Sequence, residues 1–305
     1  MILMKWILGI IAFLAGLALY FSRQTMYPKI RRPEVVMDME TSRDPSLETF
    51  FVEALKTCVS IETDDHVILD SWWYEVEKPI GIMIVVHGIR MNKYASLKYI
   101  RLFRDMGYHV LAIDLRNHGE TESKFDQFTS YGVFEQLDVK AAVDWAILKS
   151  NGLYPIFTHG ESMGASTVLL HAANDHRISG VIADCGFESA ERIFKEILWR
   201  EHHIPSWPIL YIASVFNYIK TGVYFKEMNP LVKLDDIQCP VLLIHGDADD
   251  YVVLDHAHNL AQKLRKLGKV HHLEIVEGAG HAKAIVVNSD QYEKVCRNFL
   301  NQIVD

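Results

Sequence analysis

The sequence contains few cysteines, and none of them belongs to a paired motif. No C-x-x-C spacing occurs among the four, which are Cys58, Cys185, Cys239 and Cys296. Zinc knuckles and thioredoxin-type redox sites both require such a pair, so the spacing excludes both classes of site. Isolated cysteines of this kind usually behave as small, buried hydrophobic residues.

Basic runs and nucleotide-binding patterns are also missing. The chain carries 31 Lys and Arg residues against 39 Asp and Glu residues, which gives a formal net charge of -8. Nucleic-acid-binding proteins present a basic patch or stripe, so we exclude nucleic acid as a partner. Neither a G-x-G-x-x-G nor a Walker pattern occurs, and we predict no cofactor.

Metal ligands do not form a recognisable pattern. The adjacent pairs His202-His203 and His271-His272 cannot present both rings on one face of a helix or strand, so we predict no metal site. One polar cluster at the end of a predicted strand would suit a metal or a phosphate. We interpret it instead as a hydrogen-bonded loop that supports the neighbouring site; it comprises Asp114, Arg116 and His118.

The remaining composition supplies a large core. Of the 305 residues, 50% are hydrophobic, 23% are charged and 11% are aromatic. These fractions are typical of a globular α/β or α+β protein, and they exclude disordered, collagen-like and small disulfide-stapled chains.

The longest apolar run lies near the N-terminus. Residues 6–21 carry no charge, and Met1 to Met4 extend the apolar character beyond the single Lys5. Together with a snorkelling Lys5, these positions just reach across a hydrocarbon core of roughly 30 Å. We therefore predict a single-pass membrane anchor over residues 1–22. A cleaved signal peptide is the alternative, although the run is long and ends without a small-x-small cleavage site. The positive-inside rule favours a cytoplasmic catalytic domain, because four basic residues follow the span: Arg23, Lys29, Arg31 and Arg32.

The anchor is followed by a polar segment with three prolines, residues 23–50, which we interpret as a stalk. The globular domain is then expected over residues 51–305. If the catalytic parts begin after the stalk, deleting residues 1–25 should release a soluble and active domain.

Beyond the stalk, short strand-like runs alternate with amphipathic helical patterns. The pattern predicts a hairpin (57–62 and 66–74) and further strands at 82–86, 110–113, 156–158, 181–183, 241–244 and 272–276. Helices are expected at 96–105, 133–148, 163–173, 255–267 and 292–303. This alternation predicts an α/β fold with a mostly parallel central sheet covered by helices, and a ligand site beyond the strand C-termini.

Residues 186–238 break the alternation, and the interval is too long for an ordinary connection. We predict a small helical cap there, inserted after the sixth strand. Its aromatic residues either line an acyl pocket or pack the cap onto the sheet, since both roles need large apolar side chains. They are Phe187, Trp199, Trp207, Phe216 and Tyr224.

The motif that carries chemistry is Gly160-Glu161-Ser162-Met163-Gly164, between a predicted strand and a predicted helix. In a nucleophile elbow the serine sits on a strained turn with its hydroxyl exposed, and small residues flank it because side chains there would strike neighbouring elements. We therefore predict Ser162 as the nucleophile.

A serine hydroxyl needs a base within reach and a carboxylate that orients that base. Three acids follow the strand at 241–244, namely Asp247, Asp249 and Asp250, and the residues alone do not choose among them. His281 lies after the last predicted strand and before the last helix. The chain order serine, aspartate, histidine is the order that α/β-hydrolases use, so we predict His281 as the base.

An oxyanion hole requires two backbone N–H donors, one from the residue after the nucleophile and one from the loop after an early strand. Met163 is predicted to supply the first. The turn at His87-Gly88 is expected to aim the Ile89 amide at the site, with His87 itself in a structural role.

Taken together, these motifs resemble the α/β-hydrolase superfamily in its serine esterase and peptidase branch, and especially its bacterial single-pass, membrane-anchored members. The resemblance covers residues 57–304. The stretches that carry it are HGIRMNKYASLKY from His87, DLRNHGE from Asp114, SYG from Ser130, GESMGAST from Gly160, PSWPIL from Pro205, HGDADDYV from His245 and GAGHA from Gly278. In that family the fifth position of H-G-x-x-D-x-x-V is the triad acid, which the resemblance places at Asp249. The chain departs from the usual pattern at Glu120-Thr121, where a small residue and Ser are common, and at Val253, where Pro is common.

The resemblance implies a serine hydrolase of the carboxylesterase or lipase-like type, acting through an acyl-enzyme. A hydrophobic acyl group is favoured by the aromatic cap and the nearby bilayer. A serine peptidase or an acyltransferase would use the same triad, so both stay open, as does a non-catalytic binding protein on a hydrolase scaffold. The expected partners are a small-molecule or lipid ester and the lipid bilayer; no protein partner is predicted.

Overall fold

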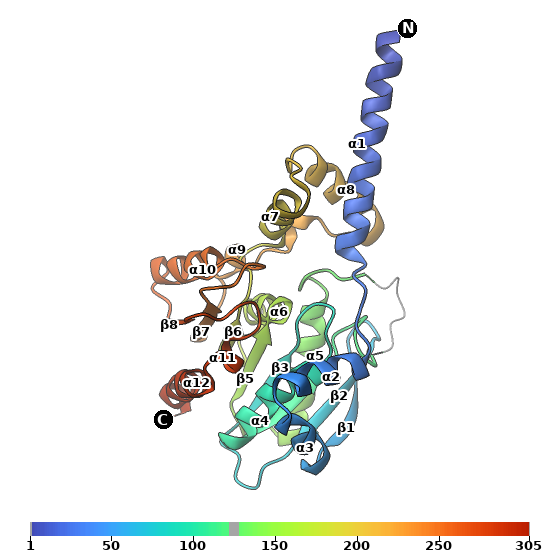
Figure 1. The fold of residues 1–305 in the computed structure, drawn as a ribbon. Helices are drawn as coiled ribbons and strands as arrows, with labels where there is room; N and C mark the ends of the chain where they lie inside the picture. Colours follow the sequence, from blue (N-terminus) through green and yellow to red (C-terminus); the bar gives the residue numbers. More distant parts are fainter. Residues whose placement is uncertain (1, 122–127, 305) are drawn as a thin grey trace.

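The fold is organised around one sheet, seen in a computed structural model that describes residues 2–121 and 128–304 (Figure 1). Eight strands follow the order β1-β2-β4-β3-β5-β6-β7-β8. β1 and β2 form an antiparallel hairpin, β2 pairs antiparallel with β4, and the other neighbouring pairs are parallel. The predicted α/β-hydrolase fold is confirmed. The strands are β1 (Thr57–Glu62), β2 (Ile68–Tyr74), β3 (Gly81–Val86), β4 (Tyr108–Ile113), β5 (Ile156–Glu161), β6 (Ile178–Asp184), β7 (Val241–Gly246) and β8 (His271–Val276).

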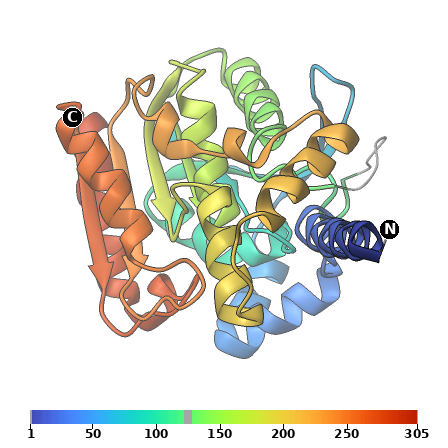
Figure 2. The same cartoon turned by 90° about the horizontal axis from the view of Figure 1, so that it is seen from above.

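Helices cover both faces of the sheet, so its central strands are buried along their whole length, and β3 reads as a continuous apolar run. On β3, Ile82 and Ile84 pack into one core, whereas Met83 and Val85 pack into the other. The first core contains α5 (Glu135–Ser150), α6 (Met163–Ala172) and α10 (Asp255–Lys266). The second contains α4 (Leu97–Asp105), which follows the short η1 (Lys93–Ser96), together with α11 (Ala284–Val287) and α12 (Ser289–Val304). Figure 2 shows this layering from above.

The segment between β6 and β7 forms the predicted cap. It consists of α7 (Ala190–His202), α8 (Ile209–Thr221), η2 (Phe225–Glu227) and α9 (Pro230–Lys233). Its aromatic residues divide between two environments. Phe187 is buried and packs the cap onto the sheet side, whereas Trp199 and Trp207 are exposed.

The apolar N-terminal run forms α1 (Ile2–Met26), which projects away from the sheet (Figure 1). Among the described residues it is the one helix long and apolar enough to cross a membrane, so it is a candidate anchor or signal sequence. Its last turns are part of the globular unit: Ala18, Phe21 and Met26 are buried in the first core. The Tyr131 hydroxyl donates to the Thr25 carbonyl at 2.9 Å.

The segment predicted as a polar stalk forms helices that pack against the domain. It contains α2 (Pro33–Arg43) and most of α3 (Ser46–Glu53), with Val36 and Leu47 buried. Glu40 of α2 is also buried, where its carboxylate pairs with Lys98 of α4 at 3.1 Å. The polar composition of the segment predicts a solvated connector. In the structure its polar groups pair with residues of the domain, and composition alone does not predict such tertiary contacts.

These contacts change the expected result of N-terminal truncation. Removing residues 2–13, which are exposed on every side of α1, should leave the free energy of unfolding of the domain nearly unchanged. Extending the deletion to residue 26 removes buried Ala18, Phe21 and Met26, and we expect a loss of about 5 kcal/mol or more in the free energy of unfolding. Denaturant titration of the two truncated chains measures the difference, and equal stability would contradict the packing described.

Candidate active site

The local structure around Ser162 is a sharp turn between β5 and α6. Ser162 has φ 56° and ψ -115°, a backbone conformation that L-residues rarely adopt. The two flanking glycines allow the elements to approach closely. A Cβ on Gly160 would lie 2.3 Å from the carbonyl carbon of Gly164, and a Cβ on Gly164 would lie 2.3 Å from the Val86 oxygen.

The structure brings Ser162 and His281 together with one of the three candidate acids. His281 Nε2 lies 2.9 Å from Ser162 Oγ, and His281 Nδ1 lies 2.7 Å from Asp249 Oδ2. The three side chains follow β5, β8 and β7, whose carboxyl ends meet at the same edge of the sheet. The arrangement can pass a proton from a hydroxyl to an imidazole that a carboxylate orients.

Asp249 is held by more than the histidine. Its Oδ1 accepts backbone N–H bonds from Tyr251 and Val252, each at 2.9 Å. Burial would raise the pKa of Asp249, but hydrogen bonds from His245 and His281 outweigh burial and hold this pKa well below its usual range. The carboxylate therefore stays ionised beside the imidazole.

The other two aspartates point elsewhere. Asp247 Oδ1 accepts the Gly278 N–H at 2.7 Å, which ties together the loops after β7 and β8. Asp250 is exposed, and its backbone carbonyl accepts a hydrogen bond from Arg200 of the cap helix α7. Of the three acids, Asp249 alone contacts His281 among the described residues.

The loop after β3 lies directly against Ser162. A Cβ on Gly88 would be 3.3 Å from Ser162 Cβ, so the adjacent Ile89 amide is near the serine. Met163 is the first residue of α6, where the N–H has no partner within the helix. His87 Nδ1 donates to the Gly88 carbonyl at 2.8 Å and its Nε2 accepts from Leu115 N–H at 3.1 Å. Burial holds the pKa of His87 well below its usual range, consistent with a neutral structural residue.

Ser162 is buried in this structure, and the cap contacts the acid loop beside it. Ser162 is 5% exposed, and the Tyr251 ring lies 5.0 Å from the His281 ring. Arg200 lies over Tyr251, 5.8 Å from its ring centroid, in addition to its bond to the Asp250 carbonyl. The sequence analysis missed Arg200 and Tyr251, because no local pattern relates a cap residue to a loop 50 positions away.

Comparison with known proteins identifies the family of the chain. The sequence model of the prolyl oligopeptidase family matches residues 94–304, which include Ser162, Asp249 and His281. The chain belongs to the prolyl oligopeptidase family. It is an α/β hydrolase of the esterase and peptidase type.

Several known proteins are similar to this prolyl oligopeptidase family member over most of its length. The chain is 32% identical over 300 residues to uncharacterized protein YqkD of Bacillus subtilis, covering 97% of this chain and 96% of that protein. In fold it is similar to the Pyrococcus furiosus esterase Pf2001, with a TM-score of 0.68, 24% identity, and coverage of 86% and 95% of the two chains. It is also similar to a Pyrococcus horikoshii acylaminoacyl peptidase, with a TM-score of 0.65, 17% identity, and coverage of 84% and 43%.

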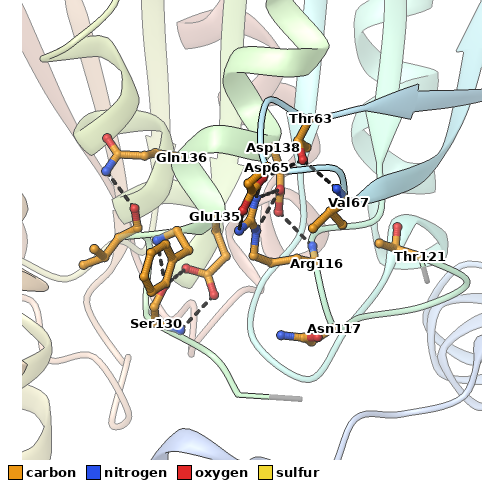
Figure 3. A network of polar contacts seen from close by, with 12 residues as sticks. Thr63, Asp65, Val67, Arg116, Asn117, Thr121, Ser130, Glu135, Gln136 and Asp138 are labelled. Carbon is orange, nitrogen blue, oxygen red and sulfur yellow. Dashed lines mark hydrogen bonds and ion pairs between the residues drawn. The ribbon is translucent and has the colours of Figure 1, made fainter. Parts of the chain in front are cut away.

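Two buried polar clusters support the loops of this family member. Figure 3 shows the first, in which Arg116 Nη2 and Nε contact Asp138 at 2.7 and 2.9 Å while Nη1 contacts Asp65 at 2.7 Å. In the second, the Lys93 ammonium lies 2.7 Å from each of three carboxylates, on Asp70, Asp114 and Glu120. Lys93 supplies the positive charge in that group of acids.

A third polar cluster lies beneath the elbow of the prolyl oligopeptidase family fold. Glu161 precedes the serine, and its carboxylate contacts Lys98 at 2.9 Å and the Tyr99 hydroxyl at 2.8 Å. Burial would lower the pKa of Lys98, but Glu161 and Glu40 outweigh burial and raise it to about 12. Burial and the Glu161 carboxylate raise the pKa of the neighbouring Asp184 to about 6. The sequence analysis also missed Lys98, since a single lysine on an amphipathic helix resembles a solvated residue.

Replacing Lys98 tests how much this cluster stabilises the fold. Lys98→Met leaves the carboxylates of Glu161 and Glu40 buried without their cation, so we expect a loss of about 3–5 kcal/mol in the free energy of unfolding. Lys149→Met is the matched control, because Lys149 forms a partly exposed pair with Glu75 and should change stability by about 1 kcal/mol or less. Denaturant titration measures both variants; similar losses would mean that Lys98 is not needed as a buried cation.

Proposed function

We propose that this protein is a serine hydrolase that cleaves a carboxylic ester through an acyl-enzyme. The observation that supports this most is the continuous hydrogen-bonded series from Ser162 Oγ through His281 to Asp249, located at a strained elbow. All three partners lie on loops at one edge of the sheet, where enzymes of this fold class carry their sites.

In the proposed reaction, Ser162 Oγ attacks the ester carbonyl carbon as its proton passes to His281 Nε2. The Ile89 and Met163 amides donate to the resulting oxyanion. Collapse of the tetrahedral intermediate breaks the ester C–O bond, and His281 returns the proton to the departing alcohol. A water molecule, deprotonated by His281, then attacks the acyl-enzyme, releasing the carboxylic acid and restoring the serine. Asp249 keeps the imidazole in the correct tautomer throughout.

Peptide or amide cleavage is the second candidate, favoured by the match to the prolyl oligopeptidase family. The two candidates differ in the leaving group, so a matched pair of substrates separates them: a p-nitrophenyl ester and a p-nitroanilide with the same acyl group. We expect turnover of the ester and weak turnover of the anilide. A kcat/KM for the anilide equal to or above that for the ester would favour a peptidase. Acyl preference follows from varying the chain length, with longer apolar chains expected to be better substrates.

We further propose that α1 is a retained single-pass anchor, with the catalytic domain on the cytoplasmic side. Packing of its final turns supports retention, because cleavage near residue 20 would remove Ala18 from the core and leave Phe21 at a frayed end. Phe21 also contacts Phe194 of α7, with ring centroids 6.1 Å apart. Mass determination of the purified N-terminus tests this, and a mature chain starting near residue 20 would establish a signal peptide instead.

The role of His281 as a base predicts a pH dependence. The imidazole must be neutral to accept the Ser162 proton, and acidification protonates it, so kcat/KM should fall as the pH is lowered. The profile is followed between about pH 8 and pH 5. Initial rates at low concentrations of a short-chain ester measure the profile, with unfolding followed at each pH as the control. A rate that does not change across this range would contradict a histidine base.

A further inference from the structure

The cap carries a row of large apolar side chains that face outward. Along α8, Tyr211, Val215, Tyr218 and Ile219 follow the spacing i, i+4, i+7 and i+8, which places them on one side of the helix. Tyr211 is 71% exposed and Ile219 is 74% exposed, and Trp207, just before the helix, is 80% exposed. We call these five residues the cap stripe.

A helix on the surface of a soluble domain normally directs charged residues outward. Over its 13 residues α8 has a single charged residue, Lys220, in its last turn. Its inward side is also mostly apolar: Ile209, Leu210 and Ala213 are buried in the first core, beside a buried Asn217 whose amide donates to the Val223 carbonyl. A helix that is apolar on both sides is typical of an environment without water on either side.

The position of α1 indicates what covers the cap stripe. α8 packs against α1, and Figure 1 shows it beside the half of α1 nearer the sheet. Lys5 and Arg23 bracket the uncharged part of α1, which at 1.5 Å per residue is about 26 Å long. The hydrocarbon core of a bilayer is roughly 30 Å thick. A spanning α1 therefore places its whole uncharged part within the apolar layer, including the turns at Ala18 and Phe21 that pack in the first core with α8.

We propose that the cap stripe docks on the lipid bilayer, with α8 lying at the boundary between headgroups and acyl chains. This inference rests on the proposed anchor, since the depth of α8 is set by α1. The side chains suit the location: Trp and Tyr are enriched at membrane interfaces, and helices with one apolar face lie in the interface plane. Lys220 and Arg23 are the basic residues in the last turns of α8 and α1. Basic side chains near a membrane surface are attracted to the phosphates of anionic lipids.

Docking also narrows the substrate class. The cap that carries the stripe contacts a loop of the candidate site, because Arg200 of α7 bonds to the Asp250 carbonyl and lies over the Tyr251 ring. An ester that reaches Ser162 past a membrane-docked cap comes from the adjoining leaflet. The substrate class that this geometry favours is an amphipathic lipid ester.

Site-directed spin labelling of the full-length chain in vesicles of phosphatidylcholine and phosphatidylglycerol tests the docking. Labels are introduced one at a time through Ile219→Cys on the cap stripe, Phe13→Cys on α1 and Leu148→Cys on α5, in a background with Cys58→Ser and Cys239→Ala. Leu148 is the matched control, since it is an apolar residue that is 77% exposed but belongs to α5 on the sheet. Collision rates with oxygen, which partitions into lipid, and with a water-soluble nickel chelate report the surroundings of each label.

The expected result is a collision ratio shifted toward oxygen at positions 13 and 219 and toward nickel at position 148. A label in lipid at position 13 with a label in water at position 219 would overturn the docking and leave the anchor in place. Labels in water at both positions would overturn the anchor and the docking with it. A label at position 219 that is shielded from both reagents would mean that protein covers the stripe, which also overturns lipid docking.

Discussion

Ser162→Ala is expected to lower kcat for ester hydrolysis by about 10⁶, leaving roughly 10³–10⁴ over the reaction in water. The hydroxyl is the atom that would bond to substrate, and Ser162 Oγ is the group that contacts His281 Nε2. The remaining rate would come from the backbone donors of Ile89 and Met163 and from substrate binding, which the substitution does not remove. Initial rates with a p-nitrophenyl ester provide the measurement.

The same variant should lose covalent labelling by a fluorophosphonate, which requires an activated serine. Ser166→Ala serves as the matched control, because Ser166 lies one turn further along α6 and its hydroxyl contacts Phe187 rather than His281. This control should label as the native chain does. Labelling of the Ser162→Ala variant at the native rate would show that another residue is the nucleophile, and thermal unfolding of both variants would reveal any general loss of structure.

Asp249→Asn is expected to lower kcat by about 10⁴, because an amide in place of the carboxylate favours the wrong imidazole tautomer and does not stabilise the imidazolium. Asp249 Oδ2 is 2.7 Å from His281 Nδ1, and burial of Asp249 keeps solvent from replacing it. The carboxylate remains ionised to well below neutral pH, as the lowered pKa requires. The loss should therefore persist across the neutral range.

Two neighbours in the same loop supply the controls. Asp247→Asn keeps an oxygen that accepts the Gly278 N–H, and Asp250→Asn changes an exposed side chain, so both should reduce kcat by about tenfold or less. Measurement of kcat for the three variants, with thermal unfolding as a check on folding, decides among the acids. A collapse of activity in either control, with Asp249→Asn nearly unaffected, would contradict the proposed role of Asp249.

Much of the fold was predictable because its signals are local. The strands and the main helices of the sheet layers are visible as apolar periodicity within windows of 5–15 residues, and a sheet buried on both faces keeps those runs uninterrupted. The elbow is equally local: Gly160 and Gly164 are required by contacts within the strand, turn and helix and with the adjacent β3. The apolar run that forms α1 is continuous in sequence, so its length is readable directly.

The polar segment after α1 was misread for a physical reason. Composition reports whether a residue prefers water, but not whether the fold offers it a partner. Glu40 reads as a solvated charge until Lys98, 58 positions away, is placed beside it. The same limit applies to the end of α1. Hydropathy assigns Phe21 to the membrane anchor, but its ring contacts Phe194 of the cap. Thr25, in the predicted stalk, accepts a hydrogen bond from Tyr131 of the domain.

By itself the sequence determined the α/β class, the cap interval, the elbow serine and the apolar N-terminal helix, because each depends on neighbours in the chain. It narrowed the acid to three residues, and a family resemblance rather than periodicity selected Asp249. Only the tertiary structure placed Asp249 on His281, buried Lys98 beneath the elbow and set α8 against α1. Those outcomes depend on which loops meet at the sheet edge and which helices pack together. Asp249 and His281 are 32 positions apart, and the end of α1 at Met26 precedes the start of α8 at Ile209 by more than 180 positions. No local pattern encodes such separations, which strand order and packing bridge.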